Sequence, residues 1–466
     1  MKSPWSRRLP QLKKLLSAGE LRFDDASLLA HSGDKWSASS LPEVVALPRS
    51  TEAVSRLLHF ASRWEIPVTA RGAGCGYVGG CVPVHGGIAL SLARMNRIKE
   101  VNEGDFVAVT QPGVILKKLQ DAVEAKGLYY PPDPASRADC SVGGTIATNA
   151  GGPRCLKYGV TRDYVLGLEV VRADGTIVSM GGRTHKNKTG FDLTRLFVGS
   201  EGLLGVVTEI TLKLIPLPPF RALLVVGFDS MRGAAGAIRA IFKAGFLPCA
   251  LEVADEFTLD AARRRTGSKQ LAGLRAMIIV ELDGQEKSVR GELPLLEKLI
   301  RAQKPRMVQR AIGSEDCERL WQVRREFSYA LRDTGLVKLN QDIVVPRGRL
   351  EDLFEFTARL QKKSGLPIAC FGHAGDGNIH CNIMFDKDWP NAQARGRAVQ
   401  DELFRQVLAW KGVITGEHGI GLAKMPWWPL AASPALRTMH EEIKKSLDPK
   451  GILNPGKFVR ANSRGN

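Results

Sequence analysis

The clearest chemical signal in the sequence is residues 371–382, which read FGHAGDGNIHCN between two β-rich runs. The Asp376-Gly377 pair is typical of a two-residue hairpin loop of type I′, in which both central residues have positive φ. With that loop, His373 and His380 face each other directly, and their Cβ atoms lie ~5 Å apart. Asn382 follows on the same face of the strand. Two facing imidazoles predict a divalent metal site. The alternative is a solvated hairpin that carries two histidines.

A second polar pair lies downstream, in residues 415–421, which read TGEHGIG. Here Glu417 and His418 place a carboxylate beside an imidazole between glycines. Together with His373 and His380, Glu417 makes a two-histidine, one-carboxylate set that leaves coordination positions open for a substrate. An exposed polar turn is the alternative interpretation of this segment.

Three glycine-rich segments precede these residues: 71–80, 140–152 and 199–207. The first contains a G-x-G-x-x-G pattern after a predicted strand, but a dinucleotide fingerprint also needs a helix that opens at the third glycine. Gly80 and Pro83 follow instead, so we exclude a Rossmann site. The exposed N–H groups of such a loop can form an anion nest for a pyrophosphate. Although each segment alone is consistent with simple turns, three in one region predict an extended ligand wrapped by backbone.

The elements that must position these residues follow from hydrophobic periodicity. From residue 42 to about 219, short strands alternate with amphipathic helices such as Thr51–Trp64. Pro216, Pro218 and Pro219 mark a boundary. Beyond them, a strand–helix–strand rhythm predicts a mixed sheet covered by helices and closed by the hairpin at 366–385. Helices around 394–410 and 434–446 follow.

Composition narrows the function further. The 466 residues contain eight scattered cysteines without a Cys-x-x-Cys pair, which argues against an intrinsic iron–sulfur cluster and favours a reducing compartment. No apolar run is long enough to predict a transmembrane helix. The net charge of +18 permits an acidic protein, an anionic membrane or nucleic acid as partner. Because the basic residues form no block, we do not expect nucleic-acid binding.

The motifs, in this order, resemble those of the FAD-linked 2-hydroxyacid dehydrogenases, a family of vanillyl-alcohol-oxidase type flavoproteins. Within that family the resemblance is strongest to the group of glycolate oxidase catalytic subunits and D-lactate dehydrogenases. It implies an α+β fold: a two-part FAD-binding domain plus an α/β cap domain with a central antiparallel or mixed sheet. The implied organisation is a helical lead-in (1–40), an FAD-binding domain (41–218), a substrate or cap domain (219–415), and a C-terminal segment (416–466) that completes the active site and the flavin domain.

The resemblance also implies which residues bind FAD. Ala73 and Cys75 stand where the family usually has Gly and Thr, and both replacements are small. The loop contains no histidine, so we expect non-covalent FAD. The implied contacts are Arg71, Gly72, Ala73, Gly74, Cys75, Gly76, Tyr77, Pro132, Asp133, Ser136, Cys140, Ser141, Gly143, Gly144, Asn149, Gly151, Gly152, Tyr158, Gly159, Glu201, Gly202, Gly205, Val206 and Asn454.

The catalytic set implied by the resemblance is a divalent metal (Zn, Mn or Fe) on the set of two histidines and Glu417, with His418 as the base that takes the substrate hydroxyl proton. The α-hydrogen leaves as hydride to the flavin, which gives a 2-keto acid. Arg324 matches the family's Leu-Trp-x-x-Arg segment and would clamp the substrate carboxylate; Arg325, or a plain surface role for Arg324, is the alternative. Lys338, expected just before a strand at 341–345, is a second candidate cation. Asn382 completes the catalytic candidates.

We expect electrons to leave through a separate acceptor: an iron–sulfur subunit, an electron-transfer flavoprotein or a membrane quinone chain. This favours a cytoplasmic protein, or one peripheral to the inner face of the membrane. Two other functions stay open from the sequence. One is a metal-dependent hydrolase that uses only the histidine site. The other is a basic nucleic-acid- or membrane-binding protein.

Overall fold

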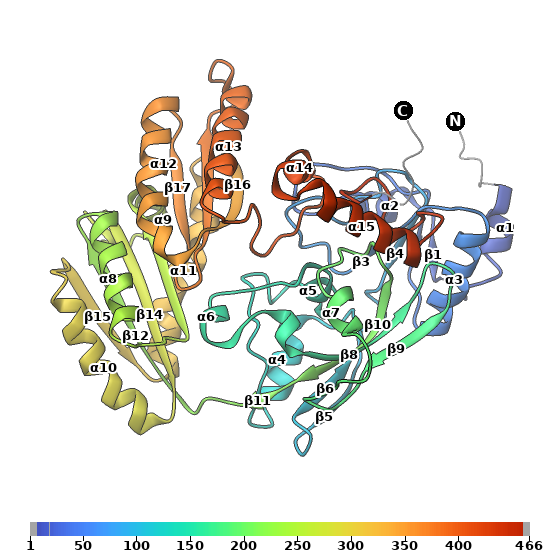
Figure 1. Cartoon of the computed structure of the whole chain (residues 1–466), viewed down its shortest axis with the longest axis horizontal. Helices are drawn as coiled ribbons and strands as arrows, with labels where there is room; N and C mark the ends of the chain where they lie inside the picture. Colours follow the sequence, from blue (N-terminus) through green and yellow to red (C-terminus); the bar gives the residue numbers. More distant parts are fainter. Residues whose placement is uncertain (1–6, 18, 460–466) are drawn as a thin grey trace.

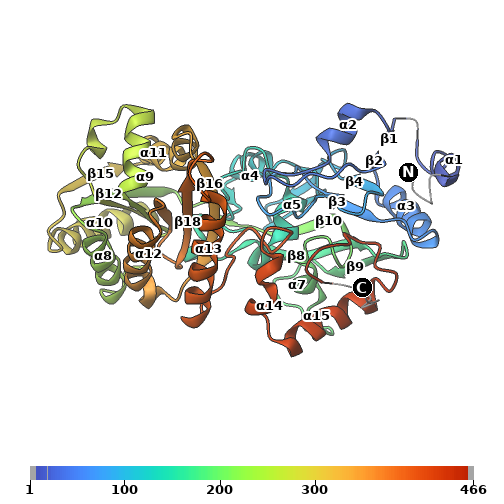
Figure 2. The ribbon, with the colours of Figure 1, turned by 90° about the horizontal axis from the view of Figure 1, so that it is seen from above.

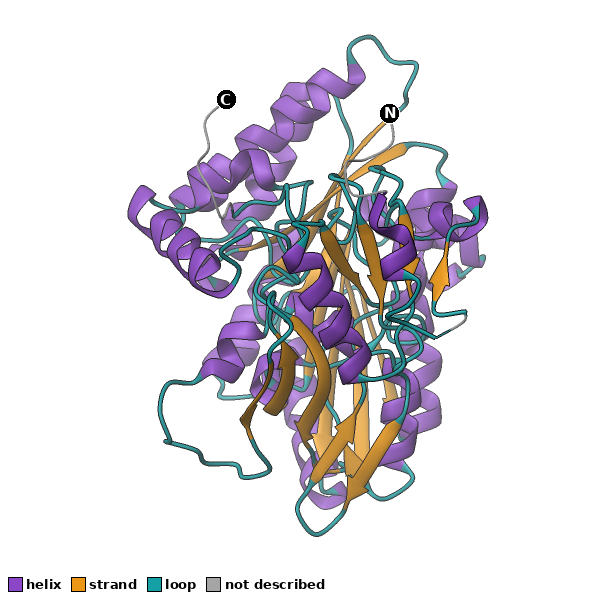
Figure 3. Cartoon of the chain, turned by 90° about the vertical axis from the view of Figure 1, so that its right-hand side faces the viewer, coloured by secondary structure: helices purple, strands orange, loops and turns teal. Residues whose placement is uncertain are grey.

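The computed structural model describes residues 7–17 and 19–459. It has two halves. One half contains most of the N-terminal part of the chain, and the other is built around a large sheet from the middle of the chain (Figures 1 and 2). The strands run through the centre of the molecule, and most helices lie outside them (Figure 3).

The first half holds two main sheets. The smaller has the order β1-β2-β4-β3, with parallel pairing of β4 to β2 and β3, and the larger is antiparallel with the order β5-β6-β10-β8-β9. A short pair, β7 and β11, precedes the second half. The strands are β1 (Leu21–Arg22), β2 (Val44–Ala46), β3 (Val68–Arg71), β4 (Ile88–Ser91), β5 (Ile98–Asn102), β6 (Val107–Thr110), β7 (Leu128–Tyr129), β8 (Val165–Val171), β9 (Ile177–Gly181), β10 (Val206–Lys213) and β11 (Ile215–Pro216).

The helices of this half follow local capping and periodicity rules. In the longest, α3, Ser50 caps the N-terminus by accepting from Ala53 N, and Val54, Leu57 and Leu58 are buried. The sequence predicted this helix to within one residue. The α-helices of this half that precede the second half are α1 (Leu9–Leu12), α2 (Asp25–Ala30), α3 (Thr51–Arg63), α4 (Leu116–Glu124), α5 (Val142–Thr148), α6 (Cys155–Tyr158) and α7 (Leu193–Phe197).

The expected helical lead-in is only partly helical. It contains α1 and α2, but β1 also lies in it and pairs with β2, so the segment adds an edge strand to the first sheet. Residues 1–6 and 18 of the lead-in lie outside the described part of the chain.

The second half is a seven-stranded sheet in the order β15-β12-β14-β13-β17-β18-β16, and each of its pairings is antiparallel. The histidine hairpin is therefore interior: β16, not the hairpin, forms that edge of the sheet. The strands are β12 (Phe220–Phe228), β13 (Ala250–Asp255), β14 (Ala276–Gly284), β15 (Met307–Ile312), β16 (Val337–Val344), β17 (Ile368–His373) and β18 (Asn378–Phe385).

Helices cover both faces of this sheet (Figure 2). Apolar side chains of α8 (Met231–Lys243), α10 (Glu286–Arg301), α12 (Leu350–Ser364) and α13 (Ala392–Ala409) share one buried cluster with the strands. Those of α9 (Glu256–Thr266) and α11 (Ser314–Asp333) share another. The inner strands of the sheet are thus buried on two faces, and polar residues within them need buried partners.

The C-terminal segment returns to the first half, where α14 (Trp428–Ala431) and α15 (Pro434–Leu447) lie (Figure 1). Buried Lys444 fixes it by donating to Asp448 Oδ2 and to the carbonyls of Leu203 and Leu453, at 2.6–2.7 Å. Between β18 and this segment, residues 415–421 pass beside the hairpin. Within the described residues, no helix is both long and apolar enough to cross a membrane.

Candidate active site

A cavity of about 970 Å³ lies between the two halves. The three glycine-rich segments line one side, and residues of α11, β16 and the histidine hairpin line the other. Eighteen of the 24 residues expected to bind FAD line this cavity: Arg71, Gly72, Ala73, Gly74, Cys75, Gly76, Tyr77, Asp133, Ser136, Cys140, Ser141, Gly143, Gly144, Gly151, Glu201, Gly202, Gly205 and Val206.

The first two glycine segments pack so closely against each other and against Pro112 that added side chains would displace them. A Cβ on Gly72 would lie 2.4 Å from Ser141 Oγ, and one on Gly143 would lie 2.5 Å from Pro112 Cβ. Ser141 also joins the segments, because its hydroxyl accepts from Ala73 N at 3.2 Å and caps α5 at Gly144 N. Small residues are therefore needed both to pack the loops and to leave their backbone accessible from the cavity. This lining fits a long, flat, anionic ligand such as FAD.

The other six predicted FAD contacts do not line the cavity and instead hold neighbouring segments. Asn454 donates to the carbonyls of Gly80 and Glu201 at 2.9 and 2.8 Å, which ties the C-terminal segment to two of the glycine loops. Tyr158 donates to Asp283 Oδ2 of the second half at 2.7 Å. Of the remaining four, Asn149 and Gly159 are the C-cap residues of α5 and α6, and the other two are Pro132 and Gly152.

The expected two-residue hairpin loop is wrong. The strands pair His373 with Asn378 and Phe371 with His380, so four residues, 374–377, connect them. Gly377 has positive φ, at +86°, whereas Asp376 does not; instead the Asp376 carboxylate accepts from Asn378 N at 3.1 Å. The type I′ turn requires positive φ at both positions, so it does not form.

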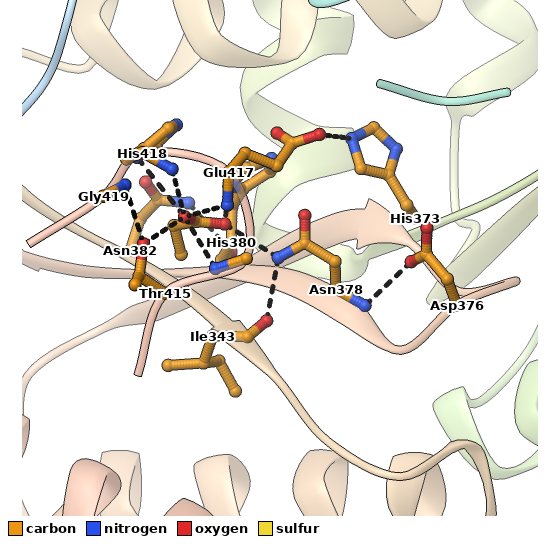
Figure 4. Close-up of polar contacts among 12 residues, drawn as sticks. Ile343, His373, Asp376, Asn378, His380, Asn382, Thr415, Glu417, His418 and Gly419 are labelled. Carbon is orange, nitrogen blue, oxygen red and sulfur yellow. Dashed lines mark hydrogen bonds and ion pairs between the residues drawn. The ribbon is translucent and has the colours of Figure 1, made fainter. Parts of the chain in front are cut away.

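Although they are not opposed, His373 and His380 still lie on one face, as diagonal neighbours with ring centroids 5.7 Å apart. Glu417 reaches the same place from the 415–421 turn, and its Oε1 is 3.5 Å from His373 Nε2 (Figure 4). One donor atom from each of these three residues lies within 4.8 Å of the others. His380 Nδ1 is buried without a hydrogen-bond partner in the described structure. This donor set fits a divalent metal.

Glu252 on β13 orients His373. Its Oε1 accepts from His373 Nδ1 at 2.6 Å, which leaves Nε2 facing Glu417. Its other oxygen accepts from Arg324 Nε at 2.5 Å. A carboxylate that fixes the outer nitrogen of a histidine is the usual support of a metal-binding imidazole.

Asp342 on β16 organises the rest of the site. It is fully buried, and its Oδ2 accepts from the Thr415 hydroxyl at 3.1 Å and from the three successive backbone N–H groups of residues 416–418 at 2.9–3.0 Å. Its Oδ1 accepts from the Asn378 side chain at 2.7 Å. The turn that presents Glu417 and His418 is therefore wrapped around one carboxylate oxygen.

The electrostatics of this cluster set the protonation of the imidazoles. Burial opposes the charge of Asp342, but His418, Lys424 and the N–H donors around it hold its pKa well below the usual range. Burial lowers the pKa of His380 to about 3 and also lowers that of His418. Both imidazoles are therefore neutral near pH 7, as a metal ligand or a base must be.

His373 is the exception among the three imidazoles. Burial alone would lower its pKa, but the Glu252 and Glu417 carboxylates on either side raise it well above the usual value, so a metal that bound at Nε2 would displace a proton. The same contact acts on Glu417, whose pKa is lowered by His373 against the effect of burial.

His418 stands between the two sides of the cavity. Its Nδ1 is 3.8 Å from Asp342 Oδ2, its ring stacks on that of His380 at 5.7 Å, and Tyr77 of the first glycine loop lies 5.4 Å away. Of the predicted catalytic residues, His418, Arg324 and Lys338 line the cavity, and Asn382 does not. The Asn382 amide donates to the carbonyls of Ala369 and His380, at 3.1 Å each.

Lys338 does not precede a strand, as expected, but lies inside β16, opposite Met384 of β18. Its ammonium donates to Ser328 Oγ of α11 at 3.0 Å. The strand begins early because residues 337–340 also pair with β18 along their whole length.

Glu201, which the resemblance implies as an FAD contact, also supports the catalytic turn. Although it lines the cavity, its carboxylate accepts from the backbone N–H groups of Ile420 and Gly421, at 2.8 Å each. It thereby anchors the far end of the turn that carries Glu417 and His418.

Sequence reasoning missed Glu252 and Asp342 altogether. The available signal was a carboxylate inside each of two strand sequences, Glu252 in ALEVAD and Asp342 in NQDIVV.

Comparison with known proteins agrees with this geometry. Residues 42–181 match the family described as "FAD binding domain", and residues 217–458 match "FAD linked oxidases, C-terminal domain". The chain belongs to the FAD-linked oxidases. The expected flavin cofactor, oxidoreductase class and α+β fold of the vanillyl-alcohol-oxidase type are confirmed.

Relatives and solved structures cover nearly the whole chain. The glycolate oxidase subunit GlcD of Bacillus subtilis (strain 168) is 37% identical over 450 residues, 96% of this chain and 96% of that protein. A D-lactate dehydrogenase of Anaerostipes hadrus is 33% identical over 464 residues, 96% and 94% of the two chains. The structure of p-cresol methylhydroxylase with substrate bound, 17% identical, superposes with a TM-score of 0.80 over 98% of this chain and 97% of that one, which supports the fold alone.

Proposed function

We propose that this FAD-linked oxidase is a dehydrogenase that oxidises a small 2-hydroxy acid, such as glycolate or D-lactate, to the 2-keto acid with the help of a divalent metal (Zn, Mn or Fe). The observation that carries the proposal is the donor cluster of His373, His380 and Glu417, which opens into the same cavity as the glycine segments. Relatives named as glycolate oxidase subunit and D-lactate dehydrogenase support the substrate class.

Each residue of the site has a distinct task in this reaction. When bound, FAD supplies the hydride acceptor, and the metal supplies a Lewis acid that lowers the pKa of the substrate hydroxyl. His373, His380 and Glu417 would hold the metal, with Glu252 orienting His373. Neutral His418 accepts the hydroxyl proton.

Arg324 binds the substrate carboxylate. Its Nε is held by Glu252, and the guanidinium lies 4.9 Å from the centre of the Phe371 ring, so the side chain is fixed in one orientation. The remaining N–H groups of the guanidinium match the two oxygens of a carboxylate.

The electrons then pass to a separate acceptor. All eight cysteines are unpaired, and within residues 7–17 and 19–459 the two possible metal clusters are both at this one site, so the described chain offers no second redox centre. The net charge of +18 favours an acidic docking protein or an anionic membrane surface, as in a cytoplasmic or membrane-peripheral enzyme. Reduced protein should reoxidise on such an acceptor at a rate that falls as salt rises, and fast salt-independent reoxidation by oxygen alone would argue against it.

The decisive experiment measures the absorbance spectrum, the metal content and the substrate preference of the purified protein. Purified protein should show a flavin absorbance band, which a panel of 2-hydroxy acids bleaches anaerobically and a dye acceptor restores. His380→Ala should lose metal and activity together and retain FAD, whereas exposed His185→Ala should change none of the three. A colourless protein that hydrolyses esters or phosphates would favour the metal-hydrolase alternative. Unchanged flavin reduction after complete metal removal would exclude the metal's role.

A further inference from the structure

Most basic side chains that line the cavity are already paired with a carboxylate. Arg324, for example, is paired with buried Glu252. The other pairs within 4 Å are Lys35–Asp139, Lys117–Asp121, Arg154–Asp133, Arg154–Glu281, Arg221–Glu281 and Arg325–Glu318. In the described part of the chain, four cavity-lining cations have no carboxylate within that distance: Arg71, Arg137, Arg332 and Lys338.

These four cations divide between the two sides of the cavity. Arg71 and Arg137 belong to segments of the first half, beside the glycine loops, where the anionic pyrophosphate of FAD is expected. Arg332 and Lys338 belong to α11 and β16 of the second half, on the side of the metal site. This second pair is left for the substrate.

On the second half, Lys338 is partly buried and Arg332 is exposed, and each contacts a neutral partner. Lys338 donates to Ser328 Oγ at 3.0 Å, and Arg332 Nη2 lies 3.5 Å from the Tyr77 hydroxyl. The two cations are close enough to repel each other: burial and the charge of Arg332 together lower the pKa of Lys338 to about 8. An anion placed between them would relieve that repulsion.

Helix geometry arranges the contacts as a row. Arg324, Ser328 and Arg332 are four residues apart, so they occupy one face of α11 on successive turns, each ~6 Å from the next. The Arg324 end reaches the metal ligands through Glu252 and His373, and the Arg332 end reaches Tyr77, which lies against His418. A substrate with one carboxylate needs only the Arg324 end of this row.

We propose that the preferred substrate is a 2-hydroxy acid with a second carboxylate, and that Arg332 and Lys338 bind this second carboxylate on the part of the cavity wall two helical turns beyond Arg324. Arg332 is thereby a specificity-determining residue. The inference rests on the proposed 2-hydroxyacid oxidation and names its substrate class. Dicarboxylic acids such as 2-hydroxyglutarate or malate have the required charge, whereas lactate and glycolate leave the two cations uncompensated.

The test compares rates of flavin reduction with 2-hydroxyglutarate, malate, lactate and glycolate, using both enantiomers of the chiral acids. The unmodified enzyme should favour one dicarboxylate over lactate by at least about tenfold in kcat/KM, the effect of one charged hydrogen-bonded contact. Arg332→Met should lower kcat/KM for that dicarboxylate by about 10- to 100-fold, mainly through KM, and change that for lactate less than about twofold. Arg332→Lys should restore part of the loss because it keeps the charge.

Arg319→Met is the matched control, because Arg319 is an exposed arginine of the same helix that pairs with Asp316 outside the cavity. Three outcomes would overturn the inference: a preference for lactate or glycolate that Arg332→Met leaves unchanged, equal losses for one- and two-carboxylate substrates, or loss of FAD from Arg332→Met. In the first case the proposed 2-hydroxyacid oxidation still stands. If no 2-hydroxy acid reduces the flavin, the proposed function itself fails.

Discussion

The two sides of the cavity are built by opposite means. On the flavin side, the lining is mainly backbone, and residues such as Gly72 and Gly143 matter because a Cβ would meet a neighbouring loop. On the metal side, the lining is polar and charged side chains, and several are held by a buried carboxylate such as Glu252 or Asp342. The first side should therefore be sensitive to added volume and the second to lost charge or hydrogen bonds.

The largest expected effect is on the flavin side. Gly143→Val places a Cβ 2.5 Å from Pro112 Cβ and 3.0 Å from the Pro112 carbonyl, so the second glycine segment must shift away from the chain that follows β6. We expect complete loss of FAD and of all activity. Gly182→Val is the control, because its Cβ meets no atom within 4 Å and its φ is unexceptional. The measurement is the molar ratio of flavin to protein in each purified variant. Full flavin content in both variants would mean that FAD binding does not need close packing of these loops.

The next largest effect should come from the base. His418→Ala removes the proton acceptor but leaves His373, His380 and Glu417 in place. The variant should keep FAD and metal, and flavin reduction should slow by ~10²–10⁴-fold. Stopped-flow reduction with metal analysis on the same sample is the measurement. A variant that reduces its flavin at the normal rate would show that another group takes the proton.

The same contrast explains what the sequence could predict. Glycine density predicted an extended ligand wrapped by backbone, and the order of motifs indicated the flavin fold; 18 of the 24 residues expected to bind FAD line the cavity. The prediction that His373 and His380 lie on one face of the hairpin was also correct. The hairpin register was not, because an Asp-Gly pair is compatible with longer loops, and the Asp376 side chain favours a four-residue connection by accepting from Asn378 N.

The support of the metal side could not be predicted from spacing. Glu252 and Asp342 are 90 residues apart in the chain and reach the site only because β13 pairs with β17 and β16 pairs with β18. Asp342 is directly opposite His380 in that register. Long-range strand order decides such contacts, and nothing local in the two strand sequences encodes it.

Asp342 therefore gives the sharpest test of how the metal side of the cavity is held together. The substitution Asp342→Asn replaces the carboxylate with a neutral amide. If the amide NH₂ faced residues 416–418, it would be a donor opposite three N–H donors and could not accept their hydrogen bonds. We expect metal affinity and flavin-reduction rate to fall by about 10- to 100-fold, with FAD retained. Exposed Asp388→Asn is the control. If metal affinity stays unchanged, the turn does not depend on the buried charge.

The smallest effect should be a pH dependence at the substrate-binding cations. Lys338 has a pKa lowered to about 8 by burial and by Arg332 of α11, and His418 is the other titratable group near it. Because the lowered pKa belongs to a cation, the ammonium is charged below about pH 8 and loses its charge as pH rises through that value. kcat/KM for flavin reduction, which reports groups of the free enzyme, should then fall a few-fold above that pH, mainly through weaker substrate binding. Lys338→Arg keeps its charge throughout and should remove this decline. If the decline persists in the arginine variant, another group causes it, and Lys338 does not bind the substrate as a cation.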